Sequence, residues 1–290
     1  MNEFGLLKTF YRELTGSRAQ IRGPRPSNSI APNRIIEALA GGGAVDGRFS
    51  SGYLFHTANI SQTVVGASNC LDLGAAPGCQ LLQVAAINPE IEFIGVDTAN
   101  ELKNIGEENT NRLGLGNVSW RNDDICALDS FETNSVDAVI STMTLHDLVD
   151  LGAVEKCFRS VSRVLKPSGA LYIEDYGRLK SAKSVSHFNA VNEAIPGDAF
   201  AELNACSMHS AFQITELKPL FAKYFPAATL HSTFLIPFLN VLKTKGLDLP
   251  HGKQEKLKDM RANLPKRQRA DLDDLSKFFK LGGWKSDPFA

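Results

Sequence analysis

The chain has 290 residues, a composition close to that of ordinary globular proteins, and a formal net charge of −1. Hydrophobic residues make up 43% and charged residues 22%, which excludes disordered and fibrous classes, and the near-zero net charge argues against a dedicated nucleic-acid binder. The five cysteines form no CxxC pair, and no apolar run approaches the ~20 residues that cross a bilayer. We therefore expect a cytoplasmic protein without a membrane segment.

Residues 1–65 are predicted to form a helical leader that docks on the rest of the chain. Apolar residues at helical spacing, from Phe4 to Leu14, predict a first helix, and glycines and prolines interrupt the pattern after it. A short second helix is expected to begin near Pro32 and to end at Gly41 and Gly42.

Residues 66–245 alternate short apolar runs with helix-length segments, a pattern typical of βαβ units. Strands are expected at NCLDLG, EFIGVD, VSWRNDD, VDAVIST and GALYIEDY, and the helix before the last of them is expected to run through Pro167. Two further strands, around Ile236 and Pro237, would close the sheet as a hairpin. The predicted fold is α/β and doubly wound, with a mostly parallel seven-stranded sheet and a terminal antiparallel hairpin.

Two segments depart from this alternation. Residues 177–213 are too long for an ordinary loop and are predicted to be a helical cap insertion over the strand ends. Residues 246–290 form a C-terminal extension, with seven Lys or Arg against two Asp or Glu between positions 251 and 270 and an aromatic part after them. The aromatic part is expected to be buried against the core or across a homodimer interface, with a lid as a third option, through Phe278, Phe279, Leu281 and Trp284.

The loop after the first strand, within LDLGAAPG, has the features of a ligand-binding turn. Gly74, Ala76 and Gly78 would let a ligand approach the backbone, and the N–H groups of the following helix favour an anionic group such as a carboxylate. Asp97 ends the second strand, where a carboxylate commonly accepts hydrogen bonds from ribose hydroxyls. The spacing differs from the G-x-G-x-x-G of a nicotinamide site, and Asp72 would repel a pyrophosphate but suit a cationic ligand.

LDLGAAPG together with FIGVD resembles motif I and the following acidic position of the class I, Rossmann-like S-adenosylmethionine-dependent methyltransferases. RNDDI, SVDAVISTMTLHDL and VLKPSGALYIED resemble the later motifs of that family, in the same order. The resemblance implies S-adenosylmethionine as cofactor and S-adenosylhomocysteine as its product. The leader, residues 1–65, is expected to cover the cofactor and substrate site. It implies that the loop binds the methionine end, Asp97 the ribose and Asp123 or Asp124 the adenine. The full implied set is Asp72, Gly74, Ala75, Ala76, Gly78, Asp97, Thr98, Asp123, Asp124, Ile125, Ser141 and Thr142.

His146 is the candidate general base. A hydroxyl acceptor needs a base near neutral pH, and histidine is suited to that task. TLHDL is similar to the LHDW segment of small-molecule O-methyltransferases, in which the matching His is the base, although Leu148 stands where that family has Trp. The histidine spacing matches no metal-ligand motif, so no metal is expected. Weaker candidates for the substrate site are Asp147, Tyr176, His187 and His209.

We therefore expect S-adenosylmethionine-dependent methylation of a small-molecule acceptor at oxygen. N-methylation of a small molecule stays open, as does methylation of RNA or protein docked on the basic part of the extension. The RNA ribose methyltransferases that share this motif I carry a lysine where this chain has Ile173 and Glu174, so nucleic acid is not the expected partner. The non-enzyme alternative is a partner protein that binds the cofactor without catalysis.

Overall fold

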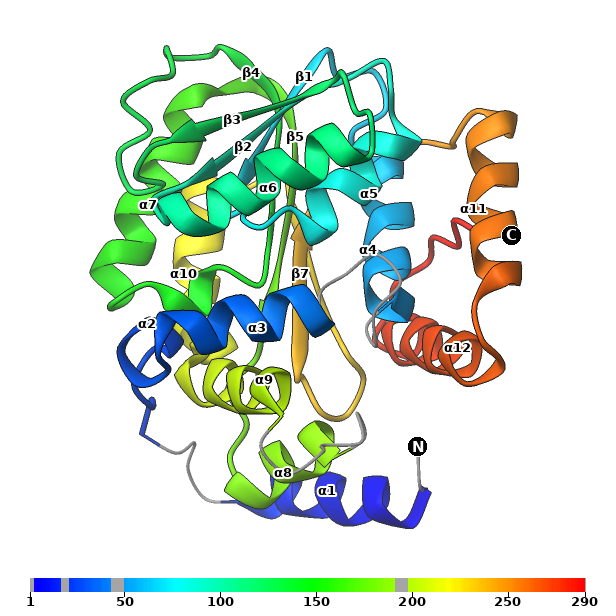
Figure 1. The fold of residues 1–290 in the computed structure, drawn as a ribbon. Helices are drawn as coiled ribbons and strands as arrows, with labels where there is room; N and C mark the ends of the chain where they lie inside the picture. Colours follow the sequence, from blue (N-terminus) through cyan, green and yellow to red (C-terminus); the bar gives the residue numbers. More distant parts are fainter. Residues whose placement is uncertain (1–2, 17–20, 43–49, 191–197, 290) are drawn as a thin grey trace.

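A seven-stranded sheet forms the centre of the computed structural model, which describes residues 3–16, 21–42, 50–190 and 198–289 (Figure 1). Its strands lie in the order β3-β2-β1-β4-β5-β7-β6, with β7 antiparallel to both neighbours and the other pairs parallel. The predicted fold class is confirmed. The strands are β1 Asn69–Leu73, β2 Glu92–Asp97, β3 Val118–Asn122, β4 Val136–Thr142, β5 Leu165–Tyr176, β6 Thr229–Ser232 and β7 Leu239–Lys243.

Helices cover both faces of the sheet because its central strands are apolar on both sides. On one face α7 and α10 pack against Val139 and Leu171, and on the other α4 and α5 pack against Ile140 and Tyr172. These two buried layers hold the strand ends in fixed positions. The helices of this part are α4 Ser50–Thr63, α5 Cys79–Ile87, α6 Asn100–Arg112, α7 Leu151–Val164 and α10 Ile214–Tyr224.

Strand β5 begins earlier than the sequence pattern indicated. The expected helix ran through Pro167, whereas α7 ends at Val164, and Leu165 already pairs with Val136 of β4. A proline disfavours the helical conformation of the residue before it, and this bias at Lys166 accounts for the earlier helix end.

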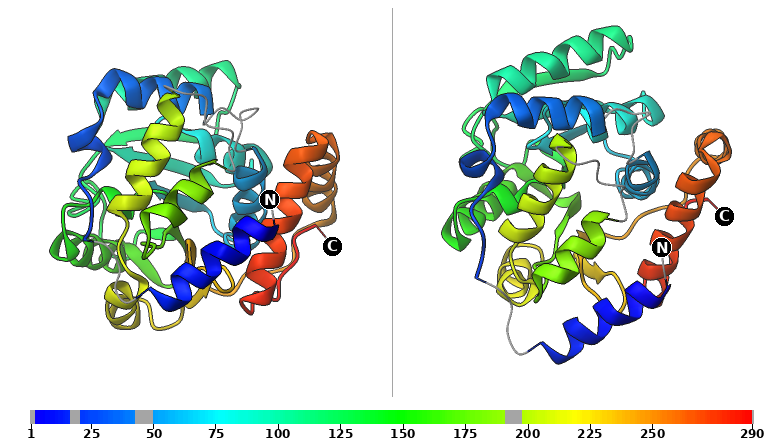
Figure 2. Two further views of the ribbon diagram at one scale, coloured as in Figure 1. Left: turned by 90° about the horizontal axis from the view of Figure 1, so that it is seen from below. Right: turned by 60° about the horizontal axis from the view of Figure 1, so that its bottom comes forward.

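The N-terminal helices and the cap lie across the C-terminal ends of the parallel strands (Figures 1 and 2). Helix α3 lies along α9, and α1 lies along α8. Residues 17–20 and 43–49 of the predicted leader, and 191–197 of the predicted cap, are outside the described residues. The helices of this layer are α1 Glu3–Thr15, α2 Pro26–Ser29, α3 Pro32–Gly42, α8 Ala182–Ala190 and α9 Ala199–Ser210.

The C-terminal extension forms two helices, α11 His251–Asn263 and α12 Lys266–Leu281, beside α4 (Figure 1). Phe279 and Trp284 are buried against Phe55 of α4. Leu281 is 63% exposed, so it does not pack against the core, and its burial across a homodimer interface stays a prediction. Leu281 is the last residue of α12, directly before the C-cap Gly282.

Part of the basic stretch is used inside the chain. Lys253 donates to Oδ1 of Asn88 at 2.7 Å, and Lys256 donates to the carbonyl oxygen of Ala86 at 2.6 Å. Both contacts fasten α11 to the C-terminal end of α5, where carbonyl oxygens attract cations. Within the described ranges, no helix combines the length and apolarity needed to cross a bilayer.

Candidate active site

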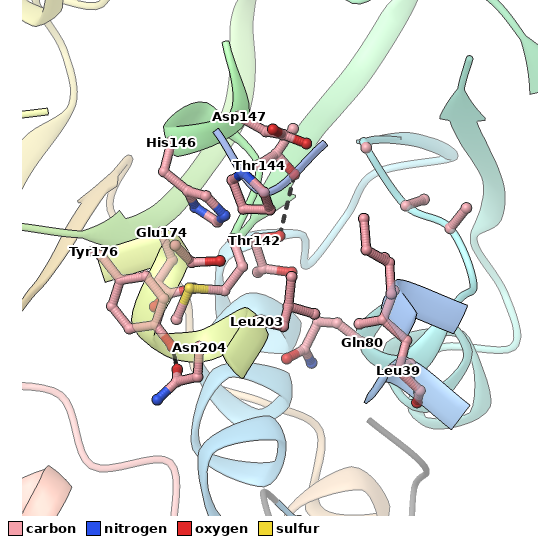
Figure 3. Close-up of a pocket in the computed structure, with 18 of the residues that line it drawn as sticks. Leu39, Gln80, Thr142, Thr144, His146, Asp147, Glu174, Tyr176, Leu203 and Asn204 are labelled. Carbon is pink, nitrogen blue, oxygen red and sulfur yellow. Dashed lines mark hydrogen bonds between the residues drawn. The ribbon is translucent and has the colours of Figure 1, made fainter. Parts of the chain in front are cut away.

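A cavity of about 890 Å³ lies where the parallel strands end (Figure 3). Sheets of this type bind ligands at that edge because the strand-to-helix loops meet there. The loops after β1, β2 and β4 line one side, and α3, α9 and the end of β5 line the other. The predicted site residues among its lining are Asp72, Gly74, Ala75, Ala76, Asp97, Thr98, Asp123, Ile125, Thr142, His146, Asp147 and Tyr176.

The loop after β1 depends on two glycines. Gly74 has a φ of +65°, and a Cβ on it would lie 2.4 Å from Cγ2 of Thr144. The Thr144 hydroxyl donates to the carbonyl oxygen of Leu73 at 3.0 Å, which holds that side chain in place. Gly78, with a φ of +96°, precedes the first residue of α5, and a Cβ on it would lie 3.1 Å from the Trp120 ring. Both positions favour glycine through their conformation and their close contacts.

Two carboxyl groups face the cavity beside this loop. Asp97 accepts hydrogen bonds from the N–H groups of Ala76 at 3.2 Å and Ala99 at 2.8 Å. Asp72 is 2% exposed, and its Oδ1 has no hydrogen-bond partner among the described residues. Burial, and after it the charge of Asp97, raises the pKa of Asp72 well above its usual value. An unpartnered buried carboxyl of this kind suits a cationic ligand group.

The two candidate aspartates after β3 differ in their positions relative to the cavity. Asp123 lines the cavity, and its Oδ2 accepts a hydrogen bond from the Ser130 N–H at 3.0 Å. Asp124 accepts instead from the Cys126 N–H at 2.8 Å, so it caps the following turn and does not line the cavity. Ile125, the residue after Asp124, lines the cavity as Asp123 does.

His146 is held by a carboxylate that the sequence analysis did not assign to the site. It sits in the 3-10 turn η1 (Leu145–Asp147), and its Nδ1 lies 2.7 Å from Oδ1 of Asp175, the next-to-last residue of β5. The His146 backbone N–H donates to the other Asp175 oxygen at 3.0 Å. Burial favours the neutral ring, but the Asp175 charge and hydrogen bond outweigh it, so the pKa of His146 is raised.

The N-terminal leader forms hydrogen bonds with the turn that carries His146. The guanidinium of Arg22 donates to the carbonyl oxygens of His146 at 2.8 Å, Leu148 at 2.6 Å and Val149 at 2.7 Å. Ser27 donates to Oδ1 of Asp147 at 3.0 Å. The leader therefore fixes the position of the candidate base as well as covering the cavity.

The far end of the cavity holds further buried polar groups (Figure 3). The Tyr176 hydroxyl donates to Oδ1 of Asn204 on α9. Glu174, 1% exposed, lies near His56 of α4, with Oε1 and the ring Nε2 3.7 Å apart. Nδ1 of His56 lies 2.8 Å from the Tyr172 hydroxyl. These groups join β5 to the two helices that flank it.

Several predicted residues do not line the cavity. His187 packs edge-on against Phe188, and the carbonyl oxygen of His209 accepts a hydrogen bond from Gly23 of the leader, so neither supports the expected substrate contact. Ser141 is buried below the cavity, where it donates to the carbonyl oxygen of Leu73 at 3.2 Å. Gly78, before α5, and Asp124, which caps the turn after β3, also do not line the cavity. Within the described residues, no cluster of His, Cys, Asp and Glu has the arrangement of a metal site.

The comparisons with known proteins agree with this geometry. A family model described as a methyltransferase domain matches residues 66–224. A ubiquinone/menaquinone biosynthesis C-methyltransferase of Pasteurella multocida (strain Pm70) is 32% identical over 93 residues, which make up 32% of this chain and 33% of that protein. The chain therefore matches about a third of the length of that curated relative.

Solved structures share the fold at low sequence identity. A putative O-methyltransferase of Nostoc punctiforme has a TM-score of 0.53 and 19% identity, with 83% of this chain and 68% of that one covered. A putative S-adenosylmethionine-dependent methyltransferase of Methanococcus maripaludis has a TM-score of 0.51 and 16% identity, with 74% and 92% covered. The plantazolicin methyltransferase BpumL, in complex with S-adenosylhomocysteine, has a TM-score of 0.51 and 12% identity, with 84% and 97% covered.

The described residues fit a cofactor with a cationic end and a ribose. The unpartnered oxygen of Asp72 suits an ammonium, the glycine conformation at Gly74 leaves room beside the backbone, and Asp97 ends β2 and lines the cavity. The family model covers more than half of the chain. The protein therefore belongs to the class I methyltransferases, as an enzyme that uses S-adenosylmethionine.

Proposed function

We propose that the enzyme methylates a hydroxyl group of a small molecule, with His146 as general base and Asp175 as the residue that orients it. The observation that carries this proposal is the buried His146–Asp175 pair, in which His146 lines the cavity and Asp175 lies behind it, 2.7 Å from Nδ1. A carboxylate on Nδ1 places the ring proton there and leaves Nε2 free to accept the proton of the hydroxyl.

The methyl donor is already activated, so the protein has to position the acceptor and remove one proton. S-adenosylmethionine, when bound, would supply the methyl group to the hydroxyl oxygen and become S-adenosylhomocysteine as its carbon–sulfur bond breaks. Nε2 of His146 would accept the hydroxyl proton. Asp175 then stabilises the resulting imidazolium by its charge and its hydrogen bond. The raised pKa of His146 makes it a stronger base than a free histidine.

The cofactor is expected to lie along the loops after β1 to β3. Asp72 and the backbone near Gly74 would hold the methionine end, Asp97 and Thr98 the ribose, and Asp123 with Ile125 the adenine. The unpartnered oxygen of Asp72 and the position of Asp97 at the end of β2 support this assignment.

The shape of the site favours a small acceptor. A volume of about 890 Å³ is at the upper end of ordinary small-molecule pockets and must hold the cofactor as well. Helices α3 and α9 cover the cavity, so a folded RNA or protein would have to displace them. We further propose that the enzyme acts in the cytoplasm, which fits its five free cysteines.

The test is methyl transfer to phenols and hydroxy acids, followed by mass spectrometry of the products, with wild type, His146→Ala and Asp175→Asn. S-adenosylhomocysteine binding is measured in parallel by calorimetry. We expect both variants to bind it as wild type does and to lose about 100-fold or more in rate. His251→Ala, in an exposed histidine of α11, is the control. Full activity of His146→Ala would refute the base assignment.

A further inference from the structure

Glu174 has no role in the chemistry proposed above, although it lines the same cavity. Its side chain is buried, and Oε1 has no hydrogen-bond partner among the described residues. Leaving a buried carboxyl without a partner is costly, so such a group in a binding cavity indicates a ligand that completes it. Figure 3 shows Glu174 beside Thr142 and Tyr176, in the same part of the cavity as His146.

The contacts of His56 show how Glu174 would be kept ready for a ligand. Burial lowers the pKa of His56 to about 3, so its ring is neutral. The Tyr172 hydroxyl is buried and its partner is Nδ1 of His56, so we assign the ring proton to Nε2. That N–H faces Oε1 of Glu174 across 3.7 Å, too far to be its hydrogen-bond partner, so Oε1 stays available to a ligand. Burial, and after it the charge of Asp175, raises the pKa of Glu174 well above its usual value, and a bound ammonium would supply the positive charge that stabilises the ionised carboxylate.

The walls around Glu174 are aromatic. Tyr176, Phe188 and Phe238 line the cavity there, and the last two rings stack with centroids 4.3 Å apart. Aromatic rings next to a carboxylate form the usual surroundings of a bound ammonium group, because both attract positive charge.

The charges of the cavity lining also favour a cationic ligand. Among the described lining residues, Arg25 is the one lysine or arginine, and it donates to the carbonyl oxygen of Asp147. No cation in the described lining therefore neutralises Glu174. Carboxyl groups are numerous by comparison, at Asp72, Asp97, Glu101, Asp123, Asp147, Glu174, Asp271 and Asp274.

We infer that the acceptor is an aromatic or aliphatic amine that also carries a hydroxyl: its ammonium binds Glu174 while the hydroxyl faces His146. This inference rests on the proposed function and adds the substrate class to it. Glu174 acts as a specificity residue, since it binds a part of the acceptor that does not react.

The test compares the binding of tyramine and 4-ethylphenol, which share the ring and hydroxyl but differ in the ammonium. Calorimetry with protein saturated in S-adenosylhomocysteine gives the dissociation constants for wild type, Glu174→Gln and Asp271→Asn. We expect wild type to bind tyramine at least about tenfold more tightly, and Glu174→Gln to lose that preference. Asp271→Asn, which changes another carboxyl of the cavity, should keep it.

Equal binding of the two probes by wild type would overturn the inference, and this comparison needs no variant. A preference that survives in Glu174→Gln, or disappears in Asp271→Asn, would overturn it as well. Binding of S-adenosylhomocysteine to each variant separates these outcomes from a misfolded protein. The proposed function is tested by methyl transfer to phenols and hydroxy acids in His146→Ala, without tyramine. Its failure can therefore be distinguished from failure of the amine inference.

Discussion

The two halves of the cavity are built in different ways. The half proposed to bind the cofactor, here the cofactor half, comes from β1, β2, β3 and the loops after them, within one stretch from Asp72 to Ile125. The half proposed to bind the acceptor, here the acceptor half, is assembled from the leader, α4, the ends of β4 and β5, and α9, which lie far apart in the chain. The first half relies on backbone conformation and carboxylates at strand ends, and the second on side chains that meet only after folding.

This difference predicts that substitutions in one half should leave the other intact. The cofactor half is supported by two buried layers of the sheet and should tolerate changes in the leader or cap. The acceptor half depends on contacts between separate segments, so a single lost contact should lower the rate without preventing cofactor binding.

Asp97→Ala is expected to have the largest effect. It removes the carboxylate proposed to accept two ribose hydrogen bonds, and charged hydrogen bonds contribute about 1.5–3 kcal/mol each, so affinity for S-adenosylhomocysteine should fall about 100-fold or more. Calorimetry measures the dissociation constant. Glu92→Ala, in an exposed carboxylate at the start of the same strand, is the control. Unchanged affinity in Asp97→Ala would remove the ribose assignment.

Asp175→Asn should affect the acceptor half alone, through both the rate and its pH dependence. The raised pKa of His146 means that activity rises as pH increases through a value above that of free histidine, because the base must lose its proton. Without the Asp175 charge the pKa of His146 falls, so activity should begin to increase at a lower pH than in wild type. The maximal rate should drop about 100-fold. A pH profile of kcat/KM checks both, and an unmoved profile contradicts the pairing.

Arg22→Ala should have an intermediate effect. It removes the hydrogen bonds to the carbonyl oxygens of the His146 turn and the stacking of the guanidinium on Phe212, 4.0 Å away. We expect kcat to fall about tenfold while affinity for S-adenosylhomocysteine stays within about threefold. Arg112→Ala, in an exposed arginine of α6, is the matched control. A large loss of cofactor affinity would show that the halves are coupled.

Leu281→Ser should have the smallest effect. Phe279 and Trp284 are buried within the chain, so the part of the aromatic segment left for a homodimer is the exposed Leu281. We expect stability to change by less than about 0.5 kcal/mol, as at ordinary surface positions. Analytical ultracentrifugation of wild type and the variant tests whether this segment joins two copies, since a dimer held there would dissociate.

The cofactor half could be predicted from the sequence because its residues follow one another along the chain. The positive φ of Gly74 and the end of β2 at Asp97 leave direct signs in residue type and spacing. Choosing between Asp123 and Asp124 required the structure, because a strand end cannot be placed to within one residue from a pattern.

The acceptor half was harder to predict. Asp175 reaches His146 because β4 and β5 are neighbours, and no local pattern states which residues two strand ends bring together. Helix α4 was missed because it is buried on most sides and shows little periodicity, and Arg22 lies in a stretch of glycine and proline. His187 and His209 were chosen for their residue type, but α8 and α9 direct them away from the cavity lining.

The contact of Arg22 with the carbonyl oxygen of Ser210 joins residues 188 positions apart. During synthesis Arg22 leaves the ribosome well before its partners on the His146 turn and at the end of α9, which are made later. The leader therefore has no place to dock until most of the chain has been translated. The cavity is therefore completed by a segment made earlier than its partners, after strands β1 to β5 have been synthesised.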